Sequence, residues 1–167
     1  CEGGSITIGE LDGGVTPRLQ QVVDMFSQAG VEIHISKNVD SLIWTKLMVN
    51  VGINALAAIT MLTNGQLLEY DGTRILQAQA VQEGAAVAKA KGIALLADDI
   101  LDYVRNIARE TYHNKASMRV DIELGAKTEI QAINGAIVAE GKRIGVATPV
   151  NATLVHLIQA IEQRGKL

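Results

Sequence analysis

The sequence predicts a mainly α fold, in which a helical domain follows an incomplete α/β segment. Apolar and polar residues alternate only within the first 36 of the 167 residues, and apolar residues recur at helical spacing from residue 37 onward. Aromatic residues make up only 3% of the chain, so the core is expected to consist of Leu, Ile, Val, Ala and Met. Side chains of this kind suit a core of closely packed helices.

The N-terminal segment is predicted to form a strand, a helix and a second strand. Residues 5–10 and 31–35 alternate as strands do, and residues 17–29 have helical spacing, with Pro17 suited to the first turn and Gly30 to the end. One βαβ unit cannot bury its own edges and faces. We therefore expect residues 1–36 to be the C-terminal part of a larger α/β domain, with a small appended cap as the alternative.

Residues 37–167 are predicted to form a separate helical domain. The expected helices cover residues 40–62, 73–91, 98–112, 117–124, 127–142 and 149–163. Asp40 or Ser41 is expected to cap the first helix, and Asn64–Gly65 to form a turn after it. Gly92 and Gly145 are expected to end two of the helices.

Composition and charge argue against several classes of protein. The net charge is −3 without a block of Lys and Arg, so a nucleic-acid partner is not expected. No uninterrupted apolar run reaches the roughly 18 residues of a membrane span, and no signal peptide is visible. The one cysteine, Cys1, cannot form an internal disulfide or a cysteine metal site, which is compatible with a reducing cytoplasm. No metal-ligand cluster, nucleophile elbow or phosphate-binding loop is recognisable.

The predicted helix at residues 40–62 is apolar around nearly its whole circumference, yet three polar residues interrupt it. Lys46, Asn50 and Asn54 are four residues apart and share one face, which we call the polar stripe. Burying amides and an ammonium without hydrogen-bond partners costs roughly several kcal/mol. Either a hydrogen-bonded or water-filled seam between helices or a polar ligand must compensate. A lysine here could hydrogen-bond a carbonyl oxygen and protonate it as it becomes an alkoxide.

Two further polar features follow along the chain. Asn114 and Ser117 lie between predicted helices, where they could hydrogen-bond a carboxylate with Lys115 adding charge, or simply cap the next helix. Glu129 is expected in the first turn of the helix at 127–142, where a carboxylate normally favours the helix dipole. Both features therefore have a structural and a functional interpretation.

Several segments together resemble the ketopantoate reductases (2-dehydropantoate 2-reductases). Trp44–Leu56 resembles the signature helix of that family, Ser117–Asp121 followed by Thr128–Gly135 resembles its second signature, and Thr148–Asn151 resembles the start of its last helix. The resemblance covers essentially the whole chain. It implies a helical domain like the C-terminal domain of 6-phosphogluconate dehydrogenase, preceded by a remnant of an NADPH-binding Rossmann domain.

The resemblance also implies roles for individual residues. Lys46 would be the general acid that protonates the keto oxygen, and Glu129 would face the NADPH side of the cleft. Substrate-binding roles are implied for Asn50, Asn54, Asn64, Asn114 and Ser117. The Gly-rich phosphate-binding turn of the family is absent from this chain, so the chain alone is expected to be inactive.

The resemblance implies a cytoplasmic, NADPH-dependent reduction of ketopantoate to pantoate, on the route to pantothenate and coenzyme A. A homodimer is compatible with the sequence. Two alternatives remain: a reductase of another 2-oxo acid, and a non-catalytic module that associates through its helices. The polar stripe argues against the second, because an association face would be more uniformly apolar.

Overall fold

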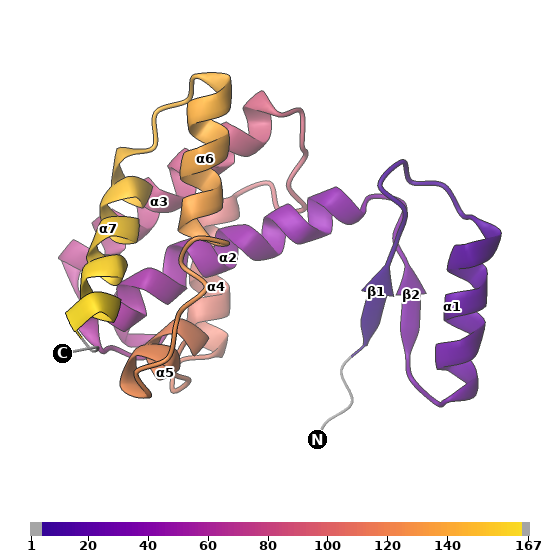
Figure 1. Ribbon diagram of the computed structural model, residues 1–167, viewed down its shortest axis with the longest axis horizontal. Coiled ribbons are helices and arrows are strands. Elements are labelled where there is room, and N and C mark those ends of the chain that lie inside the picture. The colour runs from indigo at the N-terminus through magenta and orange to yellow at the C-terminus, as the bar shows by residue number, and fades with distance from the viewer. Residues whose placement is uncertain (1–4, 165–167) are drawn as a thin grey trace. The chain divides into compact units, whose positions relative to one another are not determined.

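The computed structural model describes residues 5–164, and the chain divides into two compact units, Cys1–Ile43 and Trp44–Leu167. Helices dominate the chain, and the two strands are short, so the predicted mainly α class is confirmed (Figure 1).

The first unit has the predicted order of strand, helix and strand. Strands β1 (Ile6–Ile8) and β2 (Ile33–Ile35) pair in parallel, with Ile6 opposite Ile33. Helix α1 (Pro17–Gln28) connects them. Both strands are shorter than the predicted segments. Beyond β1, the Glu10 carboxylate accepts hydrogen bonds from Thr16 and Arg18.

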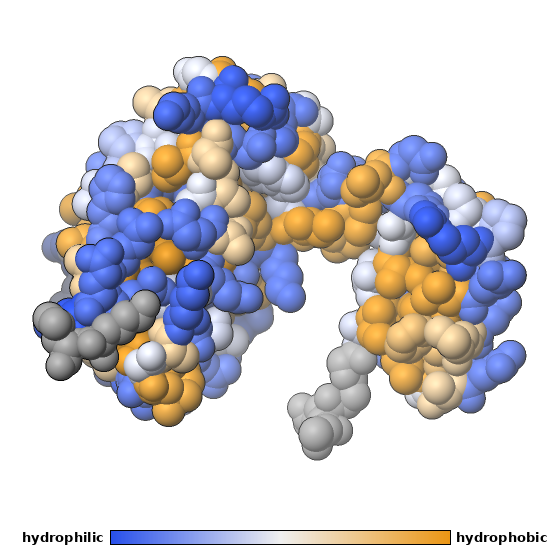
Figure 2. All heavy atoms as spheres, in the orientation of Figure 1, coloured by the Kyte–Doolittle hydropathy of each residue, from blue (hydrophilic) through white to orange (hydrophobic). Residues whose placement is uncertain are grey.

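This first unit buries little apolar surface. Among its described residues, Leu19 is the one apolar side chain that is fully buried, and large side chains such as Leu11, Val15 and Met25 are exposed. Figure 2 shows apolar atoms gathered over the face formed by the strands and α1. A single βαβ unit thus leaves its sheet face uncovered, as expected from its size.

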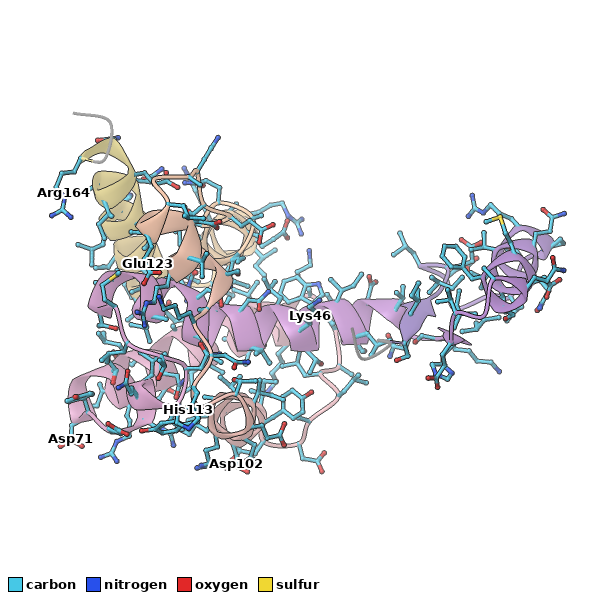
Figure 3. The ribbon with its side chains drawn as sticks, turned by 90° about the horizontal axis from the view of Figure 1, so that it is seen from below. Lys46, Asp71, Asp102, His113, Glu123 and Arg164 are labelled. Carbon is cyan, nitrogen blue, oxygen red and sulfur yellow. The ribbon has the colours of Figure 1, made fainter. Side chains whose placement is uncertain are left out.

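The second unit is a bundle of helices around α2 (Val39–Thr60), whose residues from Trp44 onward belong to it. Residues 51–58 of α2 are buried without a break, and α2 runs through the middle of the bundle in Figures 1 and 3. Its surrounding elements are η1 (Gln66–Leu68), α3 (Asp71–Ala90), α4 (Ile100–Glu110), α5 (Ser117–Glu123), α6 (Asn134–Ile144) and α7 (Pro149–Arg164). The core contains the fully buried side chains Met48, Leu56, Val81, Val104, Ile137 and Ile158.

Two predicted details of these helices are wrong. The cap of α2 is Asn38, whose Oδ1 accepts a hydrogen bond from the Ser41 amide (3.2 Å), and not Asp40 or Ser41. The helix predicted at 127–142 begins only at Asn134, because residues 127–133 form turns. The remaining helices lie where predicted to within a few residues, and both Gly92 and Gly145 follow a helix with a positive φ.

Among the described residues, helix α2 is long and apolar enough to cross a membrane by length and composition alone. Polar residues interrupt α2, but its mean hydropathy is high enough for a membrane span. The expectation that no segment is apolar enough to cross a membrane is therefore corrected. More than half of its most apolar stretch is buried inside the protein. The central helix of a helical core passes the same test, and α2 occupies that position.

A surface cluster joins the end of α3 to α6. Glu140 Oε2 accepts hydrogen bonds from Lys91 Nζ (2.7 Å) and Arg143 Nη2 (2.8 Å), and Lys91 Nζ also lies 5.4 Å from the centre of the Trp44 ring. These bonds, first from Arg143 and then from Lys91, lower the pKa of Glu140 from 4.5 to about 2. The ionised carboxylate is therefore the form that the folded state stabilises.

We predict that this cluster makes stability depend on pH in the acid range. Because the folded-state pKa is depressed, the contribution is complete above pH 4.5 and is lost as the pH falls from 4.5 toward about 2. Glu140→Gln should slightly lower the thermal unfolding midpoint at pH 7 and have less effect at pH 3. Thermal unfolding of both proteins across this range checks the prediction, which a difference independent of pH contradicts.

Candidate functional site

The polar stripe of α2 runs from the surface into the core. Lys46, labelled in Figure 3, is exposed. Asn50 is half-buried, and Asn54 retains 7% of its accessible surface. Within the described part of the chain, none of the three side chains forms a hydrogen bond or ion pair with another residue. The stripe therefore offers an ammonium and two amides to a ligand, at increasing depth along one face of an apolar helix.

The turn after α2 is joined to the loop before α5. The Asn64 amide donates to the Asn114 carbonyl (3.0 Å), and the Gly65 amide donates to the Tyr112 carbonyl (3.1 Å). Asn64 Nδ2 donates to Thr111 Oγ1 (3.0 Å), whereas Asn64 Oδ1 is buried without a partner. The structure thus brings together two predicted site residues that are far apart in the sequence.

The loop that follows leaves its polar side chains exposed. Asn114 and Ser117 are both exposed, and the N-cap of α5 is Ala116, which makes no side-chain cap. The alternative that Asn114 or Ser117 caps this helix is therefore wrong. Lys115 Nζ donates to Glu123 Oε2 (2.8 Å), so its charge is already partly balanced.

The other carboxylate oxygen of Glu123, Oε1, accepts a hydrogen bond from Arg119 Nε (2.8 Å). These two hydrogen bonds, first from Lys115 and then from Arg119, hold the pKa of Glu123 below its usual range. Lys115 and Arg119 are therefore both paired with the Glu123 carboxylate. The amide of Asn114 and the hydroxyl of Ser117 remain available to a ligand.

Glu129 lies in the turns before α6 and not in a helical first turn. Its side chain is exposed, and its carbonyl accepts hydrogen bonds from the Ala132 and Ile133 amides (2.9 and 3.1 Å). The interpretation of Glu129 as a partner of the α6 dipole is therefore wrong. In the described chain it makes no hydrogen bond with the stripe or with Asn64, Asn114 or Ser117.

A set of buried polar side chains that the sequence did not single out surrounds α2. Gln77 on α3, Asn134 on α6 and Asn151 on α7 are fully buried. Gln79 and Gln82 lie close to Gln77 in the sequence, and Gln131 lies close to Asn134, so the sequence alone does not mark these amides as buried. Asn134 and Asn151 occur in the segments that resemble family signatures, but no role was assigned to them.

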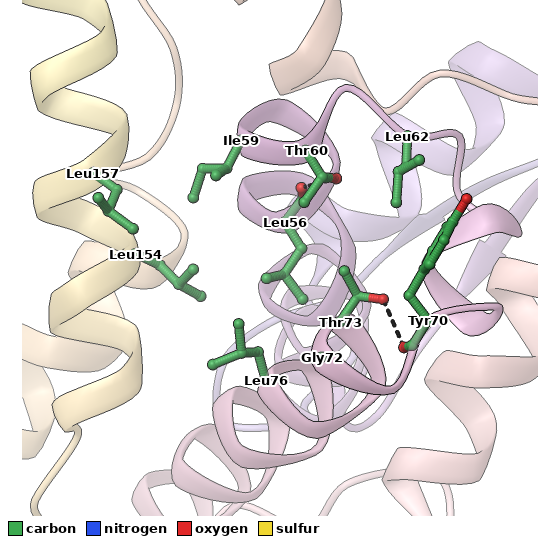
Figure 4. Close-up of a pocket in the computed structure, with 10 residues that line it drawn as sticks. All are labelled: Leu56, Ile59, Thr60, Leu62, Tyr70, Gly72, Thr73, Leu76, Leu154 and Leu157. Carbon is green, nitrogen blue, oxygen red and sulfur yellow. Dashed lines mark hydrogen bonds between the residues drawn. The ribbon is translucent and has the colours of Figure 1, made fainter.

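The bundle also has an apolar groove of about 350 Å³ between α2, α3 and α7 (Figure 4). The hydroxyls of its two threonines already donate to backbone carbonyls, Thr60 to Leu56 (2.6 Å) and Thr73 to Leu67 and Tyr70 (2.5 and 3.0 Å). The groove therefore lacks the cationic and amide groups that recognise a carboxylate, and it is not a candidate site for a charged substrate. The remaining lining is Leu62, Gly72, Leu76, Leu154, Leu157 and Ile59.

Comparisons with known proteins agree with this arrangement. Residues 38–162 match the sequence family described as ketopantoate reductase PanE/ApbA C terminal. The 2-dehydropantoate 2-reductase of Halobacterium salinarum is 36% identical over 98% of this chain and 54% of its own length. The chain spans about half the length of the curated relatives that it matches.

Solved structures have the same fold. A PanE/ApbA family ketopantoate reductase from Ralstonia eutropha has a TM-score of 0.88 at 32% identity, over 98% of this chain and 54% of its own. A D-mandelate dehydrogenase with NADH and anilino(oxo)acetate also has a TM-score of 0.88, at 29% identity over 100% and 70%. A dimeric ketopantoate reductase from Staphylococcus aureus has a TM-score of 0.81, at 25% identity over 97% and 56%.

Proposed function

Because this chain belongs to the family of ketopantoate reductase C-terminal domains, we propose that it supplies the substrate-binding and proton-donating part of an NADPH-dependent 2-dehydropantoate 2-reductase. The reaction reduces ketopantoate to pantoate, a step toward pantothenate and coenzyme A. The observation that carries the proposal is the polar stripe, which places an unpaired Lys46 beside Asn50 and Asn54 on the apolar helix α2.

Lys46 is the general acid in this proposal. Its ammonium hydrogen-bonds the keto oxygen and transfers a proton to it as hydride adds to the carbonyl carbon, which gives a secondary alcohol. The positive charge also stabilises the developing alkoxide. Because Lys46 Nζ has no partner among the described residues, its hydrogen bonds are free for the substrate.

In this proposal the amides of the polar stripe and the turn and loop after α2 bind the substrate. Asn50 and Asn54 offer both donors and acceptors to the hydroxyl and carboxylate groups of a small 2-oxo acid. The turn and loop joined by the Asn64–Asn114 bond supply further contacts, with Ser117 near the carboxylate. Support comes from the fact that the side chains of Asn114 and Ser117 are exposed, whereas Lys115 is bonded to Glu123.

The described residues do not themselves form a dinucleotide site. Thr16 and Pro17 begin α1, and the carboxylate of Glu10 lies beside them, where it hydrogen-bonds Thr16 Oγ1 (2.6 Å) and Arg18 (2.6 Å). Arg18, in the first turn of α1, is therefore paired with Glu10. In this proposal residues 1–36 are part of the cofactor domain, Glu129 lies on the cofactor side of the cleft, and residues 37–167 are the substrate domain.

We predict that this chain binds NADPH weakly or not at all, because it lacks a phosphate-binding turn. Isothermal titration calorimetry of the 167-residue chain should give no measurable heat at micromolar NADPH, and a full-length protein that contains the chain serves as the control. A micromolar dissociation constant for the chain alone contradicts the prediction.

The function is tested by NADPH oxidation in the full-length protein at saturating ketopantoate. Turnover with ketopantoate supports the proposal, and its absence in a folded, NADPH-binding protein overturns the substrate. A second candidate, a reductase for another 2-oxo acid, is favoured by the equal TM-score of the D-mandelate dehydrogenase. A higher kcat/KM for phenylglyoxylate than for ketopantoate in the same assay would select this candidate.

We place the enzyme in the cytoplasm, where pantothenate precursors are made, and propose that it forms a homodimer. The similarity to the dimeric Staphylococcus aureus enzyme supports a dimer. A purely associative role for the chain is less well supported, because the stripe formed by Lys46, Asn50 and Asn54 is polar.

A further inference from the structure

Two buried amides contact the backbone of α2 at the centre of the polar stripe. Gln77 Nε2 donates to the Gly52 carbonyl (3.3 Å), and Asn134 Nδ2 donates to the Val51 carbonyl (3.4 Å). Both side chains have no accessible surface. The two carbonyls are consecutive and lie between Asn50 and Asn54, so the bonds reach α2 from α3 and α6 within the turn that joins these two residues.

The same turn of α2 contains Gly52, where side chains of neighbouring helices lie against the helix backbone. A Cβ atom on Gly52 would lie 2.8 Å from both Val81 Cγ2 on α3 and Val104 Cγ1 on α4. One turn earlier, a Cβ atom on Gly84 would lie 2.8 Å from Met48 Sδ. The backbone of α2 at Gly52 therefore packs against the side chains of Val81 and Val104, and the absence of a side chain at Gly52 allows this contact.

Asn134 is itself held by a chain of hydrogen bonds. Its Nδ2 also donates to Asn151 Oδ1 (2.9 Å), and Asn151 Nδ2 donates to Glu83 Oε2 (2.7 Å). Glu83 in turn accepts the Val150 and Asn151 amides at the start of α7 (2.9 and 3.0 Å). The contact with α2 is thus anchored in α3, α6 and α7 at once.

Asn134 also begins α6 directly after the turns that contain Glu129. The Gly135 amide donates to the Ile130 carbonyl (2.9 Å), which fixes these turns against the first residues of α6. One side chain therefore links the segment of Glu129 with the turn of α2 that carries Asn50 and Asn54.

Stability alone does not explain these amides. Gln77 Oε1 and Asn134 Oδ1 are buried without a hydrogen-bond partner, which disfavours the folded state. An apolar side chain of similar shape would avoid that cost and fill the same space. Buried polar groups of this kind can be retained because they specify one arrangement of the elements that they join.

We propose that Gln77 and Asn134 are positioning residues, which fix the rotation of α2 about its axis and so the direction in which Lys46, Asn50 and Asn54 point. The proposal rests on the proposed function for its effect on turnover. Its structural part, that the two amides restrain the central turn of α2, does not depend on the identity of the substrate.

The decisive variant is Gln77→Met, which has nearly the same length, removes the donor and also removes the unpaired Oε1. In the full-length enzyme we expect kcat with ketopantoate to fall roughly tenfold or more, because proton transfer from Lys46 is sensitive to small displacements. KM should rise less than kcat falls. The unfolding midpoint in urea should stay the same or increase, which separates positioning from a purely structural role.

A second measurement uses the 167-residue chain and needs no substrate. In a regular helix the amides of Ala55 and Leu56 donate to the carbonyls of Val51 and Gly52. Hydrogen exchange of these two amides should become about tenfold faster in Gln77→Met, as expected for a loss of local protection. Ile158→Val, at a fully buried position on α7, is the control for a general loss of core packing.

The outcomes are distinct. Unchanged exchange at Ala55 and Leu56 overturns the proposal, as does a kcat that stays within twofold of the parent. An equal loss of kcat in Ile158→Val also overturns it, since the effect is then one of general packing. If the parent turns over no 2-oxo acid, the proposed function fails, and the exchange result still decides whether Gln77 restrains α2.

Discussion

Replacing Lys46 by alanine is expected to lower turnover of the full-length enzyme by roughly three orders of magnitude, with the fold intact. General acid catalysis typically contributes about 10²–10⁴-fold, and stabilisation of the alkoxide adds to it. Lys46 is exposed and bonded to no described residue, so its removal leaves neither a cavity nor a buried unpaired charge. The loss should therefore appear in kcat with ketopantoate and not in the unfolding midpoint.

The control for this prediction is Lys89→Ala, an exposed lysine near the end of α3. It removes the same charge from the same domain and should change kcat less than twofold. Lys46→Arg is a further variant, because it keeps the positive charge but holds its proton too tightly to donate it. Should Lys46→Ala retain turnover within tenfold of the parent, Lys46 is not the general acid.

The largest effect on stability is expected from Gly65→Ala, at the turn that joins α2 to the loop before α5. A Cβ atom there would lie 1.9 Å from Tyr112 Cδ2 and 2.7 Å from Tyr112 Cα, and the latter is backbone that a rotamer change cannot move. The φ of Gly65 is −70°, which alanine adopts easily, so the cost is steric alone. We expect a loss of about 3 kcal/mol or more, as for severe overpacking.

Thermal unfolding of the 167-residue chain measures this effect. A loss of that size corresponds to a decrease of roughly 6–12 °C in the midpoint for a domain of this length. Gly72→Ala is the matched control, since nothing lies within 4 Å of its Cβ position on the exposed face of α3. Alanine favours a helix over glycine, so the control should be neutral or stabilising. Equal midpoints for both variants would show that the Gly65 turn is not held against Tyr112.

Gly65→Ala should also weaken substrate binding. The Gly65–Tyr112 and Asn64–Asn114 backbone bonds lie next to one another, so a displaced turn separates two candidate substrate-binding residues. At a temperature where the variant is folded, KM for ketopantoate should therefore rise more than kcat falls.

Local signals in the sequence were sufficient for most of the elements. The alternation at residues 5–10 and 31–35 and the glycines 92 and 145 predict structure through their immediate neighbours. The structure has a strand within each of the two segments and a helix end before each glycine. The resemblance to the ketopantoate reductase family is also confirmed, because it uses several segments in order. The roles of the individual site residues stay predictions.

The errors arose where distant contacts override local preference. Residues 127–133 carry helix-forming side chains, but both the amide and the hydroxyl of Thr128 donate to Glu162 on α7 (2.8 and 2.7 Å), and the chain turns there. The contacts of Gln77 and Asn134 with α2 likewise join residues that are far apart in sequence. No periodicity or capping rule contains such information.

The uneven depth of the polar stripe has a consequence for which molecules the enzyme can accept. The stripe rises about 12 Å along α2 from Lys46 to Asn54, at 1.5 Å for each residue. A substrate that grows longer past Asn54 meets the filled core, whereas one that grows past Lys46 meets the surface of this domain. Differences in length or bulk among 2-oxo acids should therefore be tolerated at the lysine end and rejected at the asparagine end.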